Sequence, residues 1–149
     1  MPKGGGHLQG KPELTRYARV RRAGPLLFLA GISARQPDNS IKGAGSDRTG
    51  ALVLDVRAQT EGALENLGRT LEEHGASLAD VVDLTVFLTS MTDYGGFNEV
   101  YNRFFTASLP ARTTVGVHQL PDPALCIELK AIAYREAEHA PEVQGKKQT

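Results

Sequence analysis

The chain has 149 residues, enough for one domain with a real hydrophobic core and near the size at which oligomerisation often adds stability. Lysine plus arginine and aspartate plus glutamate both total 17, so the zero net charge argues against nucleic acid or an anionic membrane as the main partner. One cysteine excludes an internal disulfide, no signal-peptide pattern is found, and the longest apolar run, residues 25–30, is too short to span a bilayer. We therefore expect a cytoplasmic protein with a small-molecule partner.

Both ends of the chain are polar and offer little that could be buried. We expect residues 1–13 to form a flexible arm, residues 14–136 a single domain, and residues 137–149 a flexible tail. At the start of the domain, residues 17–20 and 26–30 predict two short strands around a turn that contains Gly24 and Pro25.

Residues 33–50 are rich in glycine, aspartate, asparagine and serine and lack strong periodicity, which predicts either a functional loop or an ordinary surface insertion. A helix should follow, because Asp55 can cap it and Gly75 stands where its end is expected. Its apolar stripe recurs at three- and four-residue steps and consists of Val56, Thr60, Ala63, Leu64, Leu67 and Leu71.

Residues 81–89 are β-branched and alternate, which predicts a strand whose buried face carries Val82, Leu84, Val86 and Leu88. A second helix should begin at Thr92 or Asp93 and end before Pro110. Its apolar stripe is Phe97, Val100, Tyr101 and Phe104.

Two further strands are predicted in residues 110–134, separated by the prolines of LPDP. In the first, alternation puts Arg112, Thr114 and His118 on a polar face. In the second, it puts Glu128 on the face of Cys126 and Lys130, away from the aliphatic side chains. The pattern leaves open whether these strands pair with each other.

The element order predicts an α+β fold, a mixed sheet with two helices packed on one face. Because only two helices are available, the other face would expose apolar side chains unless copies of the chain cover it. We therefore predict a homo-oligomer.

No histidine or cysteine spacing suits a metal, no glycine-rich motif suits a phosphate, and no serine has a nucleophile context. The residues that could do chemistry are Arg112 and Glu128. The planar fork of Arg112 suits a substrate carboxylate, and a partly buried Glu128 could act as a general base on water. The alternative is a structural ion pair between them, or with Lys130, and such pairs are common.

The chain resembles the RidA/YjgF family of reactive-intermediate deaminases over residues 17–135. The motifs that carry the resemblance are AGIS, DVVDLTVFLTSMTDYGGFNEVYNRFF, PARTTV and IELKAIAY, the third and fourth being a specific signature when found together. The resemblance implies a chorismate-mutase-like fold, a homotrimer with clefts between subunits, and hydrolysis of enamines or imines to a keto acid and ammonia without a metal or organic cofactor.

By this resemblance the carboxylate-binding arginine is Arg112 and the water-positioning glutamate is Glu128. Tyr17 and Asn98 fall on two further substrate-binding positions. Thr114 stands where the family usually has a cysteine, and Ala30 where it usually has a serine.

The long 33–50 segment and the run PARTTVGVHQLPDP are similar to the 2-aminomuconate deaminase branch of the family. That branch implies conversion of a dicarboxylate enamine to 4-oxalocrotonate (2-oxohex-3-enedioate) in aromatic-compound catabolism. The far carboxylate would need a second anchor, with Arg35, His118 and Arg16 as candidates. Two alternatives stay open: a generic deaminase of small intermediates such as 2-aminoacrylate, and a non-catalytic small-molecule-binding trimer that would be stabilised by a ligand without turnover. Trimers could also pair into hexamers.

Overall fold

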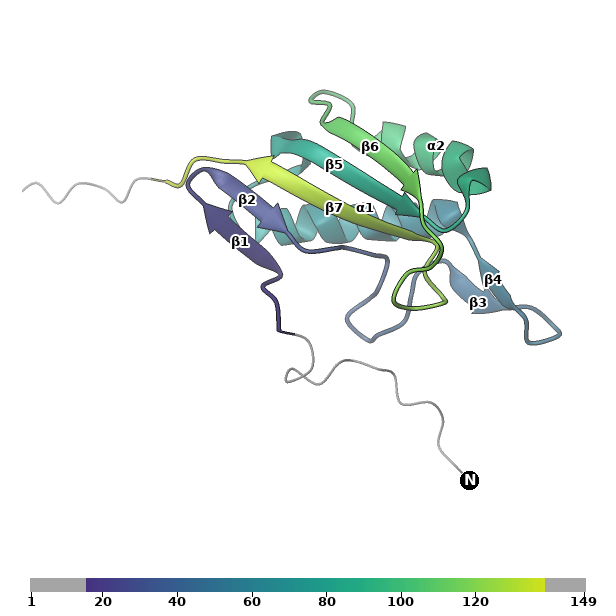
Figure 1. The fold of residues 1–149 in the computed structure, drawn as a ribbon. Helices are drawn as coiled ribbons and strands as arrows, with labels where there is room; N and C mark the ends of the chain where they lie inside the picture. Colours follow the sequence, from purple (N-terminus) through teal and green to yellow (C-terminus); the bar gives the residue numbers. More distant parts are fainter. Residues whose placement is uncertain (1–15, 139–149) are drawn as a thin grey trace, which may run out of the picture.

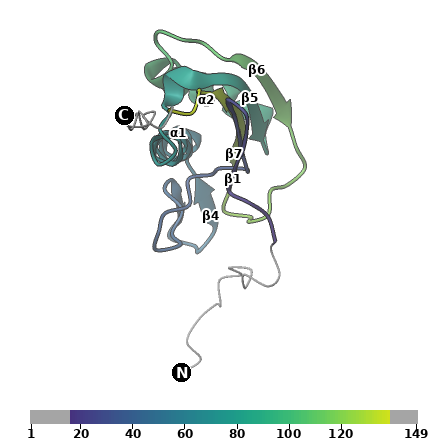
Figure 2. The ribbon, with the colours of Figure 1, turned by 90° about the vertical axis from the view of Figure 1, so that its left-hand side faces the viewer.

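The computed structural model describes residues 16–138, in which a five-stranded sheet carries both helices on one face (Figures 1 and 2). The strand order is β1-β2-β7-β5-β6. These strands are β1 (Val20–Ala23), β2 (Leu26–Leu29), β5 (Val81–Leu88), β6 (Ala111–Gly116) and β7 (Ile127–Tyr134). The predicted 1–13 arm lies outside the described residues, as does the 137–149 tail beyond residue 138.

The sheet is mixed, because β6 runs parallel to β5 while every other neighbouring pair is antiparallel. A parallel pair needs a crossover connection, and helix α2 (Tyr94–Phe104) supplies it. The two strands of the 110–134 segment do not pair with each other. They lie on either side of β5 instead, which settles the point that alternation left open.

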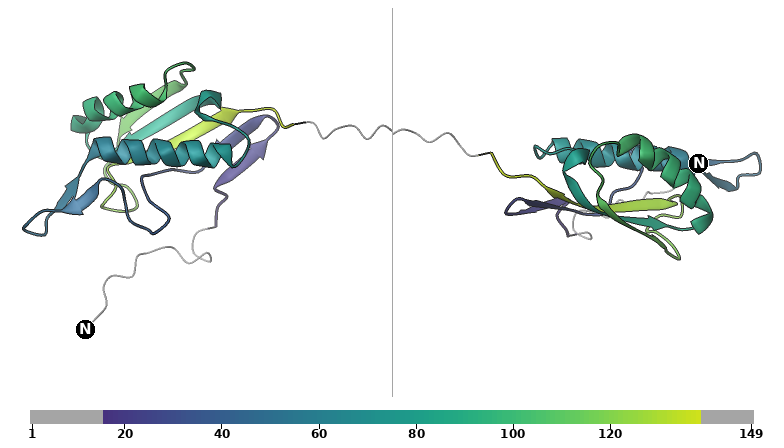
Figure 3. Two further views of the ribbon diagram at one scale, coloured as in Figure 1. Left: turned by 180° about the vertical axis from the view of Figure 1, so that it is seen from behind. Right: turned by 90° about the horizontal axis from the view of Figure 1, so that it is seen from above.

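Helix α1 (Val56–Glu72) is confirmed with its cap and its stripe. The Asp55 carboxylate accepts a hydrogen bond of 3.1 Å from the Ala58 backbone, and Gly75 adopts a φ of +76° after the helix ends. Helix α1 packs against α2 and β7 and buries its stripe there. Figure 3 shows both helices on the same face of the sheet.

Helix α2 also buries its predicted stripe, with Phe97, Val100 and Tyr101 inside and Phe104 partly buried. It begins directly after Asp93, one of the two predicted cap residues, and a 3-10 turn at Met91–Asp93 precedes it. Asp93 stands at the cap position without a side-chain hydrogen bond, and Ser90 caps the 3-10 turn through the Thr92 backbone.

Three details of the strands correct the sequence prediction. The first strand begins at Val20 and includes Arg21 and Arg22, which we assigned to the turn. A bulge at Val81 and Asp83 buries Val81 and exposes Val82. The predicted buried face is therefore correct from Leu84 onward and wrong at Val82. Residues 33–50 are not all loop, because Ala44–Ser46 (β3) pairs with Leu52–Leu54 (β4) in a protruding hairpin (Figure 1).

The core lies between the helices and the sheet, and the opposite sheet face, here called the open face, has no helix over it (Figure 3). Phe28 and Val115 lie on the open face and are each 37% exposed. The α+β architecture with both helices on one face is therefore confirmed. Among the described residues, neither helix is long and apolar enough to cross a membrane.

Candidate functional site

Arg112 lies on the helix-covered side of the sheet, where it stacks on the aromatic stripe of α2. Its backbone is in register with Leu84 of β5, which is fully buried beneath the helices. The guanidinium carbon is 4.5 Å from the ring centre of Tyr101 and 5.1 Å from that of Phe97. Such cation–π contacts hold the planar fork flat against the rings and leave its edge available for hydrogen bonds.

The Tyr94 hydroxyl fixes the guanidinium further, since it accepts a hydrogen bond of 3.2 Å from Arg112 Nη2. Arg112 forms no ion pair with any carboxylate of residues 16–138. The guanidinium contacts aromatic ring faces and a neutral hydroxyl, and neither neutralises its positive charge. Arg112 is therefore able to bind an external carboxylate.

Thr114 and Asn98 belong to the same side of the sheet. Thr114 follows Arg112 by two residues on β6, and its hydroxyl is buried without a hydrogen-bond partner among the described residues. Asn98 is half-buried one helical turn beyond Tyr94, so by spacing it shares the stripe that contacts Arg112. We call Arg112, Thr114 and Asn98 the anchor half of the site.

Glu128 lies on the open face, in register with Phe87 of β5. It lines a hollow of about 660 Å³ together with Tyr17, so two of the residues that the resemblance marks line the same hollow. Burial raises the pKa of the Glu128 carboxyl above its ordinary value, since the charged form loses water there. The other residues that line this hollow are Ala18, Arg21, Phe28, Leu29, Ala30, Gly31, Phe87 and Lys130. We call Glu128 and Tyr17 the base half.

The anchor half and the base half lie on opposite faces of one sheet. The register shows this directly, because Arg112 and Leu84 are partners on the buried side while Glu128 and Phe87 are partners on the open side. The structural ion pair between Arg112 and Glu128 is therefore wrong as an interpretation. Within one chain, the two residues also cannot contact one substrate molecule.

The candidates for a second anchor do not line the hollow. Arg35 forms an ion pair of 2.8 Å with Asp122, so that its charge is already compensated while it ties the 33–43 segment to the LPDP loop. His118 and Arg16 are exposed.

Two cations that do line the hollow, Arg21 and Lys130, were not among the candidates predicted from the sequence. Alternation had put Lys130 on the face of Glu128, whereas Arg21 was hidden in a predicted turn.

Cys126, expected on the face of Glu128, is part of the hydrophobic core instead. Its position precedes β7, so the alternation of that strand does not extend to it. Burial raises the pKa of the thiol to about 12, which makes it a poor nucleophile. Residues 16–138 contain no group of three or more histidine, cysteine or acidic side chains arranged to hold a metal ion.

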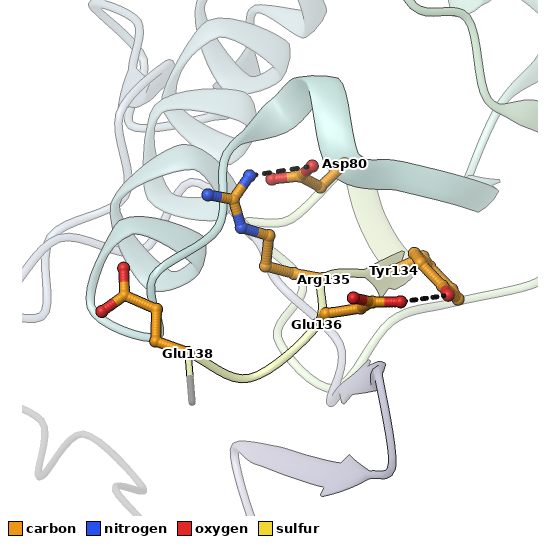
Figure 4. Close-up of a pocket in the computed structure, with 5 residues that line it drawn as sticks. All are labelled: Asp80, Tyr134, Arg135, Glu136 and Glu138. Atoms are coloured by element: carbon orange, nitrogen blue, oxygen red, sulfur yellow. Dashed lines mark hydrogen bonds and ion pairs between the residues drawn. The ribbon is translucent and has the colours of Figure 1, made fainter. Parts of the chain in front are cut away.

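A second hollow lies at the far end of β7 (Figure 4). It is lined by Asp80, Tyr134, Arg135, Glu136 and Glu138. Arg135 reaches toward Asp80 with 3.8 Å between Nη1 and Oδ1, and Tyr134 donates to Glu136. With three carboxylates and one guanidinium, its charge does not suit an anionic substrate.

Comparison with known proteins shows to which family this chain belongs. Residues 10–135 match the family model described as Endoribonuclease L-PSP. The chain is 40% identical over 121 residues to a RutC family protein of Pyrococcus abyssi, covering 80% of this chain and 87% of that protein. Over 91 residues it is 41% identical to the 2-iminobutanoate/2-iminopropanoate deaminase of Salmonella typhimurium, covering 59% of this chain and 70% of that one. The crystal structure of E. coli TdcF with bound serine superposes with a TM-score of 0.68 at 31% identity, covering 82% of this chain and 90% of that chain.

The matched family model and the RutC and deaminase relatives show that the chain belongs to the RidA/YjgF family.

Proposed function

We propose that this protein is a deaminase of enamines and imines, and that its substrate is 2-aminomuconate. Membership of a family whose relatives are named reactive intermediate deaminases supports the chemistry in general. The proposal rests on the presence of two groups in one chain. Arg112 stacks on aromatic rings and forms no ion pair among the described residues, and Glu128 lies in a hollow where burial raises its pKa.

Arg112 binds the carboxylate beside the amino-bearing carbon of the substrate. A carboxylate on a guanidinium edge forms two parallel charge-assisted hydrogen bonds, which fix both its position and its plane. Thr114 follows Arg112 on the same face of β6, and its hydroxyl, which has no partner among the described residues, can donate to the same carboxylate.

Glu128 performs the hydrolytic step. Tautomerisation moves a proton from nitrogen to carbon and gives the imine, after which water adds to the imine carbon while Glu128 takes its proton. That proton is returned to the nitrogen to give the neutral carbinolamine. Transfer of the hydroxyl proton to nitrogen, again through Glu128, then breaks the C–N bond, releases ammonia and leaves the carbonyl of 2-oxohex-3-enedioate. A pKa raised by burial makes the carboxylate a stronger base and a competent proton donor in the second half of the step.

The site that does this chemistry is completed by a second copy of the chain. Because the two halves lie on opposite sheet faces, a substrate can touch both only where the open face of one subunit meets the β6 edge of another. The exposed Phe28 and Val115 on the open face support burial there. We propose the homotrimer predicted above, located in the cytoplasm.

Mixing two inactive variants tests this arrangement. Arg112→Ala and Glu128→Gln should each abolish ammonia release and loss of the 2-aminomuconate chromophore. Refolding the two together at equal amounts should restore about one quarter of the wild-type activity, since each site draws its two halves from different subunits at random. No recovery in a mixture that forms native oligomers would contradict the shared site.

The name of the Salmonella relative favours a second candidate, deamination of small 2-imino acids. Ammonia release measured side by side from 2-aminomuconate and from 2-aminoacrylate generated in the assay separates the two. A higher kcat/KM for 2-aminoacrylate would overturn the substrate proposed here while leaving the roles of Arg112 and Glu128 in place.

A further inference from the structure

The base-half hollow contains two cations that the hydrolytic mechanism does not use. Arg21 and Lys130 line it together with Glu128, which is its one acid among the lining residues. Neither cation forms an ion pair with Glu128 or with any other carboxylate of residues 16–138. The hollow therefore carries an excess of positive charge that suits an anion.

The register of the sheet orders these groups along the hollow. Glu128 is paired with Phe87 at one end, and Arg21 is paired with Phe28 at the other. Lys130 follows Glu128 by two residues on the same face of β7, a spacing of roughly 7 Å along a strand. The ring of Phe28 on β2 gives the hollow apolar surface between Glu128 and Arg21, and the ring of Phe87 on β5 flanks Glu128 on its other side.

Both cations have N–H groups that are available to bind an anion. Lys130 Nζ donates one hydrogen bond of 3.2 Å to the Leu29 carbonyl, which draws the ammonium toward β2 and leaves two of its three protons available. The Arg21 guanidinium makes no hydrogen bond to another group of residues 16–138, while its backbone pairs with Phe28 in the sheet.

We infer that Arg21 and Lys130 form a second carboxylate subsite, so that this site selects substrates with acidic groups at both ends. The inference deepens the proposed function and rests on it for the direction in which the substrate lies. One carboxylate is held by Arg112, the reacting carbon lies at Glu128, the hydrocarbon chain runs along the hollow toward Phe28, and the far carboxylate reaches Lys130 and Arg21.

Equilibrium binding of two stable probes tests the subsite without turnover. Muconate and sorbate share a six-carbon diene acid and differ only in whether the far end is a carboxylate or a methyl group. Calorimetry should show tighter binding of muconate to the wild-type protein. Lys130→Gln and Arg21→Gln should each weaken muconate binding about five- to tenfold and leave sorbate binding within about twofold.

Arg48→Gln is the matched control. It removes one positive charge from the exposed turn of the β3–β4 hairpin, outside the hollow, and should leave both probes unaffected. Equal weakening of muconate and sorbate by the hollow variants would overturn the inference, and so would equal affinities of the wild-type protein for the two probes or binding of neither.

Kinetics then separate this inference from the proposed function. If the wild-type protein releases no ammonia from 2-aminomuconate yet prefers muconate through Lys130 and Arg21, the deaminase proposal fails and the subsite stands. If it releases ammonia and the two variants turn over 2-aminomuconate with an unchanged KM, the deaminase proposal stands and the subsite fails.

Discussion

The Glu128 carboxylate lies directly over the backbone of Gly31, where a β-carbon would come within 2.6 Å of Glu128 Oε1. A pair of backbone hydrogen bonds between Ile32 and Leu129, each 2.8 Å, fixes this approach beside the carboxylate. The absence of a side chain at Gly31 therefore creates the space that the Glu128 carboxylate occupies.

Gly31→Ala should displace the carboxylate and lower kcat by about tenfold or more, because small errors in the position of a base are costly. The protein should keep its fold, since Gly31 is exposed and its φ does not require glycine. Steady-state deamination with circular dichroism measures both. Gly45→Ala, where the new methyl group meets nothing within 4 Å, is the control and should be fully active.

Tyr94→Phe removes the hydroxyl that accepts from Arg112 and keeps the ring that the guanidinium faces. We expect KM to rise about two- to fivefold with little change in kcat, because the fork is less well oriented for the substrate carboxylate. Tyr134→Phe loses a hydroxyl that donates only to Glu136 and should leave KM unchanged. An unaltered KM in Tyr94→Phe would remove this tyrosine from the positioning of Arg112.

Glu128→Gln should stabilise the folded protein at neutral pH by roughly 0.5–1 kcal/mol while it abolishes turnover, as often holds for strained functional groups. The folded pKa of Glu128 is raised above the unfolded value, so the native state loses stability as the pH rises through that interval. The advantage of the variant should therefore shrink as the pH falls from neutral through the raised pKa, and it should be gone below the ordinary glutamate value of about 4.5. Urea unfolding at several pH values checks this, and a difference that does not vary with pH would contradict it.

Gln59→Leu should destabilise the protein by roughly 2–4 kcal/mol, because two buried backbone groups lose their partners. The fully buried Gln59 amide donates to the Ala124 carbonyl at 2.8 Å and accepts from the Cys126 backbone at 3.0 Å. Urea unfolding at a fixed protein concentration measures the loss. Gln119→Leu, at an exposed position, should change stability by less than about 0.5 kcal/mol.

Periodicity predicted the elements that bury one continuous stripe, and α1 is the clearest case. It failed where a strand is short or irregular. The strand Ala44–Ser46 has three small residues and no β-branched side chain, so nothing local marks it. The bulge in β5 arises from pairing with β7 and is invisible in one strand alone.

The site shows the same limit. Alternation grouped Arg112 with Thr114 and Glu128 with Lys130, which is correct for each strand. It did not predict that the Arg112 face of β6 is the more buried one or that the strand ends at Gly116, before His118. Whether the two faces coincide depends on strand order and direction, which are long-range properties. The polar face of β6 lies under aromatic rings of α2, and only the packed structure shows that these rings, rather than a carboxylate, accompany the arginine.

The place of β7 in the sheet has a consequence for how the chain folds. Arg112 and Tyr94 are 18 positions apart within one β5–α2–β6 unit, whereas the contact between Lys130 and Leu29 joins residues 101 positions apart. Contacts across long loops form late, because the entropy of loop closure is lost before they are made. β7 is the last strand within residues 16–138, yet it inserts between β2 and β5. A newly synthesised chain therefore brings Glu128 into place in the same event that closes its sheet.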